Sequence, residues 1–224
     1  MFIPPYFPEP IVVPNNVSDA PYDPRLGFIR QVVALHALSG LATTALAFYI
    51  PWSLTLTESL IVFFACLTGH SLLRLAWGGR RTEGILSPAL LPFTLVATAL
   101  LGRALHAEGW PIFALPIGLL GATAYVAVAG RDFSFIGQYV IAGLFTILGC
   151  FGANWYDPRA MPHPWLGSFL GLAALAYYVY DLAMVLKRRR IDERLCAVSD
   201  LHCDLLNAFS YPIRVFHHWR KFSI

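Results

Sequence analysis

The chain has 224 residues, of which 57% are hydrophobic and 13% are charged, and its formal net charge is +3. A soluble domain carries about 25% charged residues, so this composition excludes an ordinary soluble protein and predicts an integral membrane protein. The small positive charge is accounted for by basic residues between apolar stretches, so nothing in it calls for a nucleic-acid partner.

The first 24 residues contain seven prolines with aromatic residues between them. The aromatic positions are Phe2, Tyr6, Phe7 and Tyr22. This pattern is typical of an extended, polyproline-like segment rather than of a helix or a strand. We therefore predict an N-terminal arm at 1–24 that binds either a partner or the cytoplasmic face of the protein itself. The segment lacks the basic and apolar regions of a secretory signal, so no cleaved leader is expected.

Six apolar segments follow, each close to the length of about 20 residues that crosses the hydrocarbon core of a bilayer. We place these spans near 30–50, 54–76, 86–104, 110–130, 135–155 and 164–186. A seventh segment at 195–217 is less apolar and cannot face lipid on all sides, so it is either enclosed by the other helices or lies in the membrane interface. We favour the enclosed helix. The prediction is an all-α, polytopic seven-helix domain at 25–217 with a short basic tail at 218–224.

The distribution of basic residues between the spans predicts the orientation of the chain in the membrane. With the N-terminus inside, the outer connections hold only Arg103 and Arg159. The cytoplasmic segments then hold Arg25, Arg30, Arg80, Arg81, Arg131, the run Lys187 to Arg190, and Arg194. We therefore expect the N-terminus and the connection at 187–194 to lie on the cytoplasmic side.

Two acidic residues lie inside membrane segments, where an unpaired charge costs several kcal/mol and marks a candidate functional site. Asp181 lies in the sixth span and Asp204 in the seventh, both near the cytoplasmic side. Arg74 of the second span is at a similar depth and is a candidate latch, with Asp200 and His202 as further neighbours. Two close carboxylates cannot both ionise easily, so such a pair is proton-sensitive. Alternatively, these acids pair with Arg74 and the basic connection and serve only helix packing.

Other polar residues predict simpler roles. We expect His36 and His70 to be hydrogen-bonded packing residues, and Glu58 to be either interfacial or part of an outer vestibule. The four cysteines show no metal-binding spacing and are expected to be reduced. No nucleophile elbow, His-Glu-x-x-His motif or phosphate-binding loop is present, so we expect neither an enzyme nor a tight metal or cofactor site.

Four short motifs occur in the same order along the chain as in a known family. Asp132, Phe133, Ser134 and Gly137 resemble a "DFS-x-x-G" signature, although Asp132 and Ser134 also read as a helix N-cap. Gly27 to Val32 is similar to the entry into that family's first helix. Tyr180-Asp181 resembles its sixth-helix "Y-D", and Asp204 to Phe209, which includes Asn207, resembles its seventh-helix "D-I-I-N-L-F". Together they resemble the transmembrane Bax inhibitor motif (Bax inhibitor-1-like) family.

This resemblance implies a seven-helix bundle whose last helix is surrounded by the other six, with Asp181 and Asp204 as a pH-sensitive gate for a calcium or cation leak. Arg74 matches the family's latch by position only. Calcium would then be a transient ligand or permeant ion, because weak binding is what permeation requires. The implied location is the inner membrane of a bacterium. The alternative is a non-catalytic accessory subunit or regulator of a larger membrane complex, bound through the arm, since Asp200, His202 and Cys203 depart from the family pattern.

Overall fold

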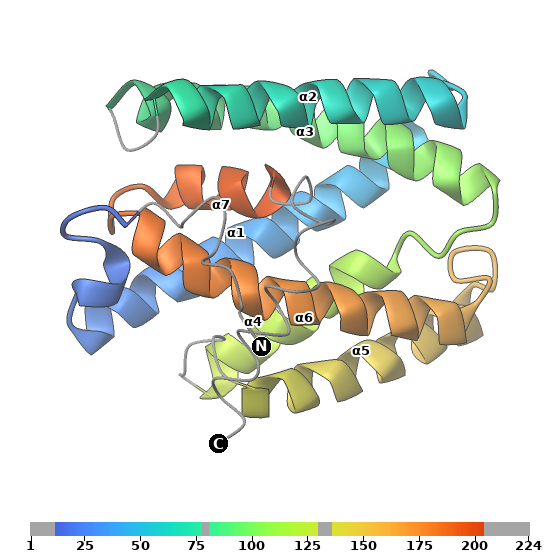
Figure 1. Cartoon of the computed structure of the whole chain (residues 1–224). Coiled ribbons are helices and arrows are strands. Elements are labelled where there is room, and N and C mark those ends of the chain that lie inside the picture. Colours follow the sequence, from blue (N-terminus) through green and yellow to red (C-terminus); the bar gives the residue numbers. More distant parts are fainter. Residues whose placement is uncertain (1–11, 78–80, 130–135, 204–224) are drawn as a thin grey trace, which may run out of the picture.

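The computed structural model describes residues 12–77, 81–129 and 136–203, and these residues form helices without any strand (Figure 1). A short 3-10 helix, η1, at Val17–Asp19 precedes the first long helix. The seven α-helices are α1 at Tyr22–Tyr49, α2 at Leu56–Trp77, α3 at Arg81–Ala107, α4 at Ala114–Ala129, α5 at Ile136–Tyr156, α6 at Pro164–Arg188 and α7 at Arg194–Cys203. The predicted all-α class is therefore confirmed.

The helix boundaries differ from the predicted spans where local chemistry extends a helix beyond its apolar part. α1 begins at Tyr22 rather than near residue 30. Pro24 is tolerated in its first turn, because N–H groups there have no acceptor within the helix and proline therefore removes no helical hydrogen bond. α3 begins at Arg81 rather than near residue 86, so that Pro88 and Pro92 lie inside it. Both helices therefore continue past the apolar segment at the end of the molecule where the arm lies.

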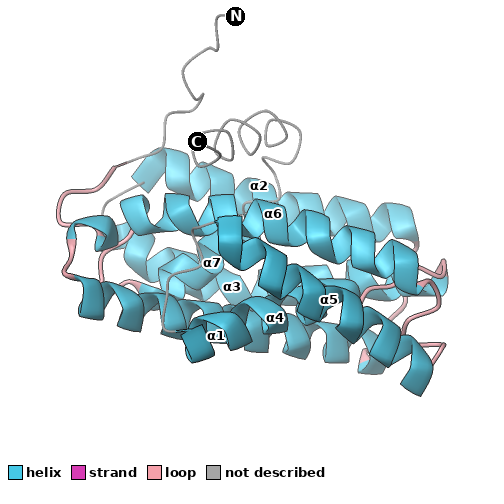
Figure 2. Ribbon diagram, turned by 90° about the horizontal axis from the view of Figure 1, so that it is seen from below, coloured by secondary structure: helices cyan, strands magenta, loops and turns pink. Residues whose placement is uncertain are grey.

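Within the described residues, four helices are long and apolar enough to cross a membrane, namely Tyr22–Tyr49, Thr82–Ala107, Tyr139–Tyr156 and Pro164–Arg188. Two shorter apolar stretches, Leu56–His70 and Ala114–Val128, lie in α2 and α4. The chain is a polytopic membrane protein. Figure 2 shows that its loops gather at the two ends of the bundle, as expected when helices cross the same layer side by side.

The helices form three groups, with α1 and α7 lying between the α2–α3 pair and the group of α4, α5 and α6 (Figure 1). The described part of α7 packs against α1, α2, α3 and α6. Its residues from Cys196 to Leu201, and also Cys203, are buried. The least apolar helix is thus enclosed, as predicted, because its acid and histidine find polar partners on the surrounding helices.

Glycines allow α4, α5 and α6 to approach closely. A Cβ atom added at Gly121 would lie 3.1 Å from the Ala142 carbonyl oxygen, and one at Gly171 would lie 2.5 Å from the Cγ2 atom of Thr146. Small residues at such positions let membrane helices make close backbone contacts, since lipid provides no hydrophobic force between helices. The main core is built from α1, α4, α6 and α7 around Phe28, Ile29, Val179 and Leu182.

Exposed tryptophan and tyrosine side chains gather at one end of the bundle, where α1 and α5 end and α2 and α6 begin. They are Tyr49, Trp52, Trp155, Tyr156 and Trp165, which are between 67% and 92% exposed. Amphipathic rings at this level are typical of the membrane–water interface. This end therefore marks one membrane boundary, and the opposite end carries the arm and the α6–α7 connection.

Candidate functional site

Asp181, the first acid singled out by the sequence, is buried in α6 and is only 8% exposed. Tyr178, which is 4% exposed, precedes it by three residues and therefore lies on the same face of the helix. Tyr180 faces another cluster with Met184 and Tyr177. The α6 sequence thus places one carboxylate and one phenol on the side of the helix that faces the interior.

The partner predicted for Asp181 lies outside the part of the chain that the structure describes, which ends at Cys203. The predicted Asp181–Asp204 pair therefore stays a prediction. Arg74 belongs to α2, but its side chain is not among the described ones, so its proposed role as a latch is also untested.

His202 of α7 meets polar groups of α1 in the interior of the bundle. Its Nε2 atom lies 2.6 Å from the hydroxyl oxygen of Ser39. The ring centroids of His202 and His36 are 4.4 Å apart, with the planes at 84°. His36 also stacks on Tyr178 of α6, with centroids 5.4 Å apart. A polar path therefore runs from α7 through α1 to the face of α6 that carries Asp181.

His70 of α2 forms a separate polar contact. Its Nε2 atom lies 2.9 Å from the hydroxyl of Thr94 in α3, and both residues are buried. Thr94 donates its hydroxyl to the Leu90 carbonyl, so the ring nitrogen of His70 is the donor to Thr94. The predicted role of His70, a hydrogen-bonded packing residue, agrees with this contact between α2 and α3.

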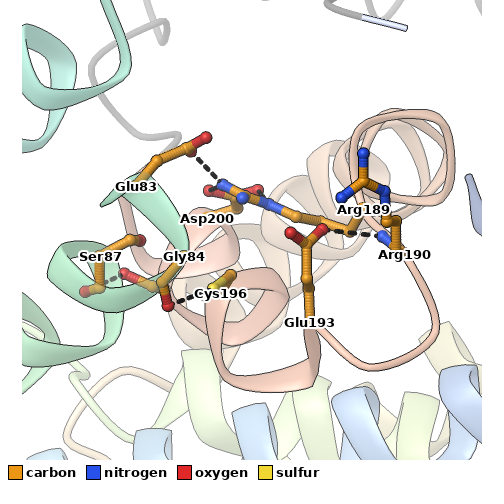
Figure 3. A network of polar contacts seen from close by, with 9 residues as sticks. Glu83, Gly84, Ser87, Arg189, Arg190, Glu193, Cys196 and Asp200 are labelled. Carbon is orange, nitrogen blue, oxygen red and sulfur yellow. Dashed lines mark hydrogen bonds and ion pairs between the residues drawn. The ribbon is translucent and has the colours of Figure 1, made fainter. Parts of the chain in front are cut away.

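A buried ion cluster joins three segments at the arm end of the bundle (Figure 3). The Nε and Nη2 atoms of Arg189 donate to the two carboxylate oxygens of Asp200 at 2.7 Å and 2.8 Å. Nη2 also donates to Oε1 of Glu83 at 2.5 Å. Glu83 belongs to α3, Arg189 to the α6–α7 connection and Asp200 to α7. We call these three residues the ion cluster.

The ion cluster is almost completely shielded from the exterior, since the exposed fractions of Glu83, Arg189 and Asp200 are 4%, 3% and 0%. Burial by itself lowers the pKa of Arg189, but the Asp200 and Glu83 carboxylates outweigh this effect and raise that pKa above its ordinary value. Arg189 therefore remains a cation. The planar guanidinium suits this position because it can bind one carboxylate with two parallel hydrogen bonds and still reach a second.

Two further hydrogen bonds attach α7 to the beginning of α3. The Cys196 thiol donates to the Gly84 carbonyl at 3.3 Å, and the Ser199 hydroxyl donates to the Ser87 carbonyl at 3.1 Å (Figure 3). These bonds lie on the same side of α7 as Asp200, because positions 196, 199 and 200 are three and four residues apart. The ion cluster therefore lies within a polar contact between α3 and α7.

The described part of the arm is bound to the same end. The Val13 N–H donates to the Lys187 carbonyl at 3.1 Å, and the Val17 N–H donates to the Arg189 carbonyl at 2.8 Å. Val17 is fully buried, and the Asn16 side chain caps η1 by accepting the Ser18 N–H. The arm residues and the 187–194 connection lie at one end of the bundle, an arrangement that the positive-inside pattern requires.

The remaining predicted residues divide into two sets. Tyr22 begins α1, is 48% exposed and lies beneath the Arg25 guanidinium, while Gly137 lies in the first turn of α5. The others lie outside the described residues, namely Phe2, Tyr6, Phe7, Asp132, Phe133, Ser134 and Asn207. Glu58 forms a capping box at the start of α2, since its carboxylate accepts the Thr55 N–H and hydroxyl at 2.8 Å each.

Cysteine and metal chemistry can be assessed only within the described ranges. All four cysteines lie there, and no disulfide joins them. In residues 12–77, 81–129 and 136–203, no group of three or more His, Cys, Asp or Glu side chains is arranged to hold a metal ion.

Sequence reasoning missed Glu83 and Arg189 as partners of Asp200, and it missed Ser39. Glu83 precedes the predicted third span at 86–104, although α3 includes it. One signal was available, because Asp200 matches the depth of the basic connection more closely than Asp204 does. The hydroxyl of Ser39 gave no signal, since an isolated serine in an apolar helix has no pattern of its own.

Comparison with known proteins gives one informative similarity. The chain is 26% identical over 206 residues to a protein named BI1-like protein from Arabidopsis thaliana, and the match covers 85% of this chain and 80% of that protein. No protein-family model and no solved structure matches the chain. The similarity confirms the predicted resemblance to the Bax inhibitor-1-like family. Because the relative comes from a plant, the bacterial inner membrane and the cytoplasmic N-terminus remain predictions.

Proposed function

We propose that this chain, as a membrane protein similar to the Bax inhibitor-1-like proteins, is a pH-sensitive leak for calcium or another cation. The observation that carries the proposal is the buried carboxylate of Asp181, 8% exposed in a helix that packs against the enclosed α7. A buried carboxylate in a membrane bundle is retained at a cost of several kcal/mol. In the proposed function this carboxylate binds the passing cation or a proton.

In this proposal Asp204 supplies the second carboxylate. Two carboxylates with backbone carbonyls and water bind calcium weakly, and weak binding allows the ion to leave again. A proton shared by the pair competes with the cation, so the leak responds to pH. The polar side chains of His36, Ser39 and His202 support the proposal because they provide a hydrophilic path beside Asp181 through an otherwise apolar core.

The ion cluster supports a closed resting state in the same proposal. Arg189 holds the beginning of α3 and the beginning of α7 together, and it does so with two hydrogen bonds to Asp200 and one to Glu83. In the proposed leak, a bundle fastened in this way is closed at the arm end. Neither catalysis nor a tightly bound cofactor is part of the proposed function.

Purified protein reconstituted into liposomes with an enclosed calcium indicator tests this function. We expect calcium entry whose rate changes between pH 5 and pH 8, and an Asp181→Asn variant with at least a tenfold lower rate or a flattened pH profile. Glu58→Gln is the matched control, because Glu58 is an exposed capping residue at the other end of the bundle. Wild-type liposomes without calcium or other cation entry at any of these pH values would refute the leak.

The alternative function is that of a non-catalytic subunit or regulator of a larger membrane complex. It is favoured by the arm, where Val12 and Tyr22 present 62% and 48% of their surface to the exterior. Purification in mild detergent distinguishes the two functions. A stoichiometric partner that is lost when residues 1–11 are deleted, together with absent flux, would favour the regulator.

A further inference from the structure

Two histidines of different helices, His36 and His202, meet in the interior of the bundle. His36 of α1 is 6% exposed, and its ring lies edge to face with that of His202 in α7, with centroids 4.4 Å apart. The proposed leak uses these side chains only as part of the hydrophilic path beside its carboxylates and gives the contact between the two rings no role of its own. The contact is nevertheless where α7 meets α1, one of the helices that enclose it.

The hydrogen bonds of Ser39 determine which nitrogen of His202 carries hydrogen. The Ser39 hydroxyl donates its single hydrogen to the His36 carbonyl at 2.8 Å. It can therefore only accept in its 2.6 Å contact with Nε2 of His202, so this nitrogen is the donor. In the neutral ring the hydrogen is then on Nε2, and Nδ1 is the nitrogen that can take up a proton.

His36 contributes a second open position. Its Nδ1 atom is buried and has no hydrogen-bond partner among the described residues. A buried polar atom left without a partner costs about 1–3 kcal/mol. An apolar residue at the same position would pack without this cost. An unpartnered nitrogen next to a second imidazole is therefore a candidate position for a proton or a water molecule.

We propose that His36 and His202 form a proton-binding site that controls the contact between α1 and α7. The inference deepens the proposed function, on which it rests for its effect on flux, by adding a histidine site to the carboxylates. Imidazole takes up a proton near pH 6.5 in ordinary surroundings. The site therefore gives the protein a response to mildly acidic pH. Carboxylates alone respond in this pH range only when their surroundings raise their pKa strongly.

The groups that surround the site decide what an added proton does. Ser39 of α1 contacts His202, Tyr178 of α6 stacks on His36, and the other titratable residues on the helices packed against α7, or on α7 itself, are His70, Glu83, Asp181, Asp200 and Cys203. Glu83 and Asp200 are held by Arg189, so they do not balance a new charge. The side chains that contact His202 are Ser39 and His36, and neither of them is an acid.

Protonation of His202 therefore places a cation in contact with a hydroxyl and a second imidazole rather than with a carboxylate. The Nε2–H group of His202 keeps its hydrogen bond to Ser39. The new Nδ1–H group needs an acceptor or a water molecule. The ring of His36 lies edge to face with that of His202, which is a ring contact and not a hydrogen bond. A buried charge without a partner costs several kcal/mol. The contact between α1 and α7 consequently opens far enough to admit water, and the polar path beside Asp181 becomes hydrated.

Cys203, the residue after His202, provides a test that does not depend on flux. It is 3% exposed, and replacing Cys66, Cys150 and Cys196 by serine leaves it as the single thiol. Its rate of reaction with a small maleimide is measured from pH 5.5 to pH 8 and divided by the rate for the unfolded protein at the same pH. This division removes the ordinary effect of thiol ionisation.

We expect the normalised rate to rise at least fivefold as the pH falls from 8 to 5.5. In a His202→Gln variant, whose amide still donates to Ser39 but takes up no proton, the rate should stay low throughout. The matched control is His163→Gln, an exposed histidine at the other end of the bundle, which should respond as the single-thiol protein does. Equal responses of His202→Gln and the single-thiol protein, or no response in either, would overturn the inference.

The outcome also separates this inference from the proposed function. A pH-dependent opening that needs His202, in a protein without cation flux in liposomes, would keep the proton site and refute the leak. Conversely, pH-dependent flux that is identical in the wild type and in His202→Gln would keep the leak and refute the proton site. As a folding control, the His202→Gln protein should elute from size-exclusion chromatography like the wild type and should have the same helix content at pH 8. Unfolding then cannot account for either result.

Discussion

The backbone N–H of Val17 donates to the carbonyl of Arg189 at 2.8 Å, while the side chain of the same arginine binds Asp200 and Glu83. One residue of the α6–α7 connection thus links the arm, α3 and α7. Because its main chain and its side chain serve different partners, substitutions of the arginine and of the valine test separate parts of this junction.

Replacing Arg189 by Gln leaves the Glu83 and Asp200 carboxylates buried without their cation. Removing one partner of a buried ion pair costs about 3–5 kcal/mol. We expect a loss of this size in the free energy of unfolding, measured by urea titration in detergent with tryptophan fluorescence. Arg190→Gln is the control, since the neighbouring arginine is exposed and its loss should change the free energy by less than about 1 kcal/mol. Equal losses in the two variants would contradict the assigned role of Arg189.

The two acids of the ion cluster should contribute unequally. Asp200 accepts two hydrogen bonds from Arg189, whereas Glu83 accepts one. We therefore expect Asp200→Asn to lower the free energy of unfolding by about 3 kcal/mol and Glu83→Gln by roughly half as much, because hydrogen bonds to charged groups contribute about 1.5–3 kcal/mol each. Urea titration of both variants in one detergent gives the comparison. A larger effect of Glu83→Gln would show that α3 rather than α7 is the main attachment of Arg189.

The contribution of the Arg189 charge to stability should not change with pH in the neutral and alkaline range. The pKa of Arg189 is raised above its ordinary value, because the Asp200 and Glu83 carboxylates outweigh the effect of burial. A raised folded-state pKa gives stability that is fully present below the unfolded-state pKa and is lost only as the pH rises through the folded-state value. The difference in unfolding free energy between wild type and Arg189→Gln should therefore be constant from pH 7 to pH 10. A difference that falls within this range would mean that Arg189 loses its proton there.

Shortening Val17 tests the attachment of the arm. Val17 is fully buried in the main core, whereas Val12 is 62% exposed. We expect Val17→Ala to lower the free energy of unfolding by about 1–3 kcal/mol, since removal of buried methyl groups leaves a cavity. The same substitution at Val12 should have almost no effect. In addition, limited proteolysis should cut the arm of Val17→Ala faster than that of the wild type, and an unchanged cleavage rate would argue against a docked arm.

A glycine substitution tests the close packing of α4, α5 and α6. A Cβ atom at Gly171 would lie 2.5 Å from Thr146 and 3.2 Å from the Ala114 carbonyl oxygen, whereas one at Gly152 would meet nothing within 4 Å. Gly171→Ala should lower the midpoint of thermal unfolding in detergent, because overpacking costs about 1–3 kcal/mol. Gly152→Ala should leave the midpoint unchanged or raise it slightly, since alanine favours a helix more than glycine does. The opposite order would contradict the observed packing.

Hydropathy predicts the helices because it depends on residues that are close in the sequence. The first six predicted spans all correspond to helices, and α7 is enclosed because it cannot satisfy Asp200 and His202 in lipid. The ion cluster could not be predicted in the same way. Its members come from three segments, so their pairing depends on the relative rotation of α3 and α7, which hydropathy does not determine. Counting depth along each helix brings Asp200 near the basic connection but does not select Arg189 among the neighbouring basic residues.

The attachment of Val17 to Arg189 also constrains the order in which the chain can assemble. The carbonyl that receives the Val17 N–H belongs to a residue that is synthesised about 170 residues later. At about 5–20 residues per second, the arm waits roughly 10–35 s for its partner on a translating ribosome. Closure of such a distant contact is a late and slow step. Chains that end before residue 189 therefore lack the carbonyl that accepts the Val17 N–H, and they expose Val17. Such incomplete bundles would be substrates for quality control in the membrane.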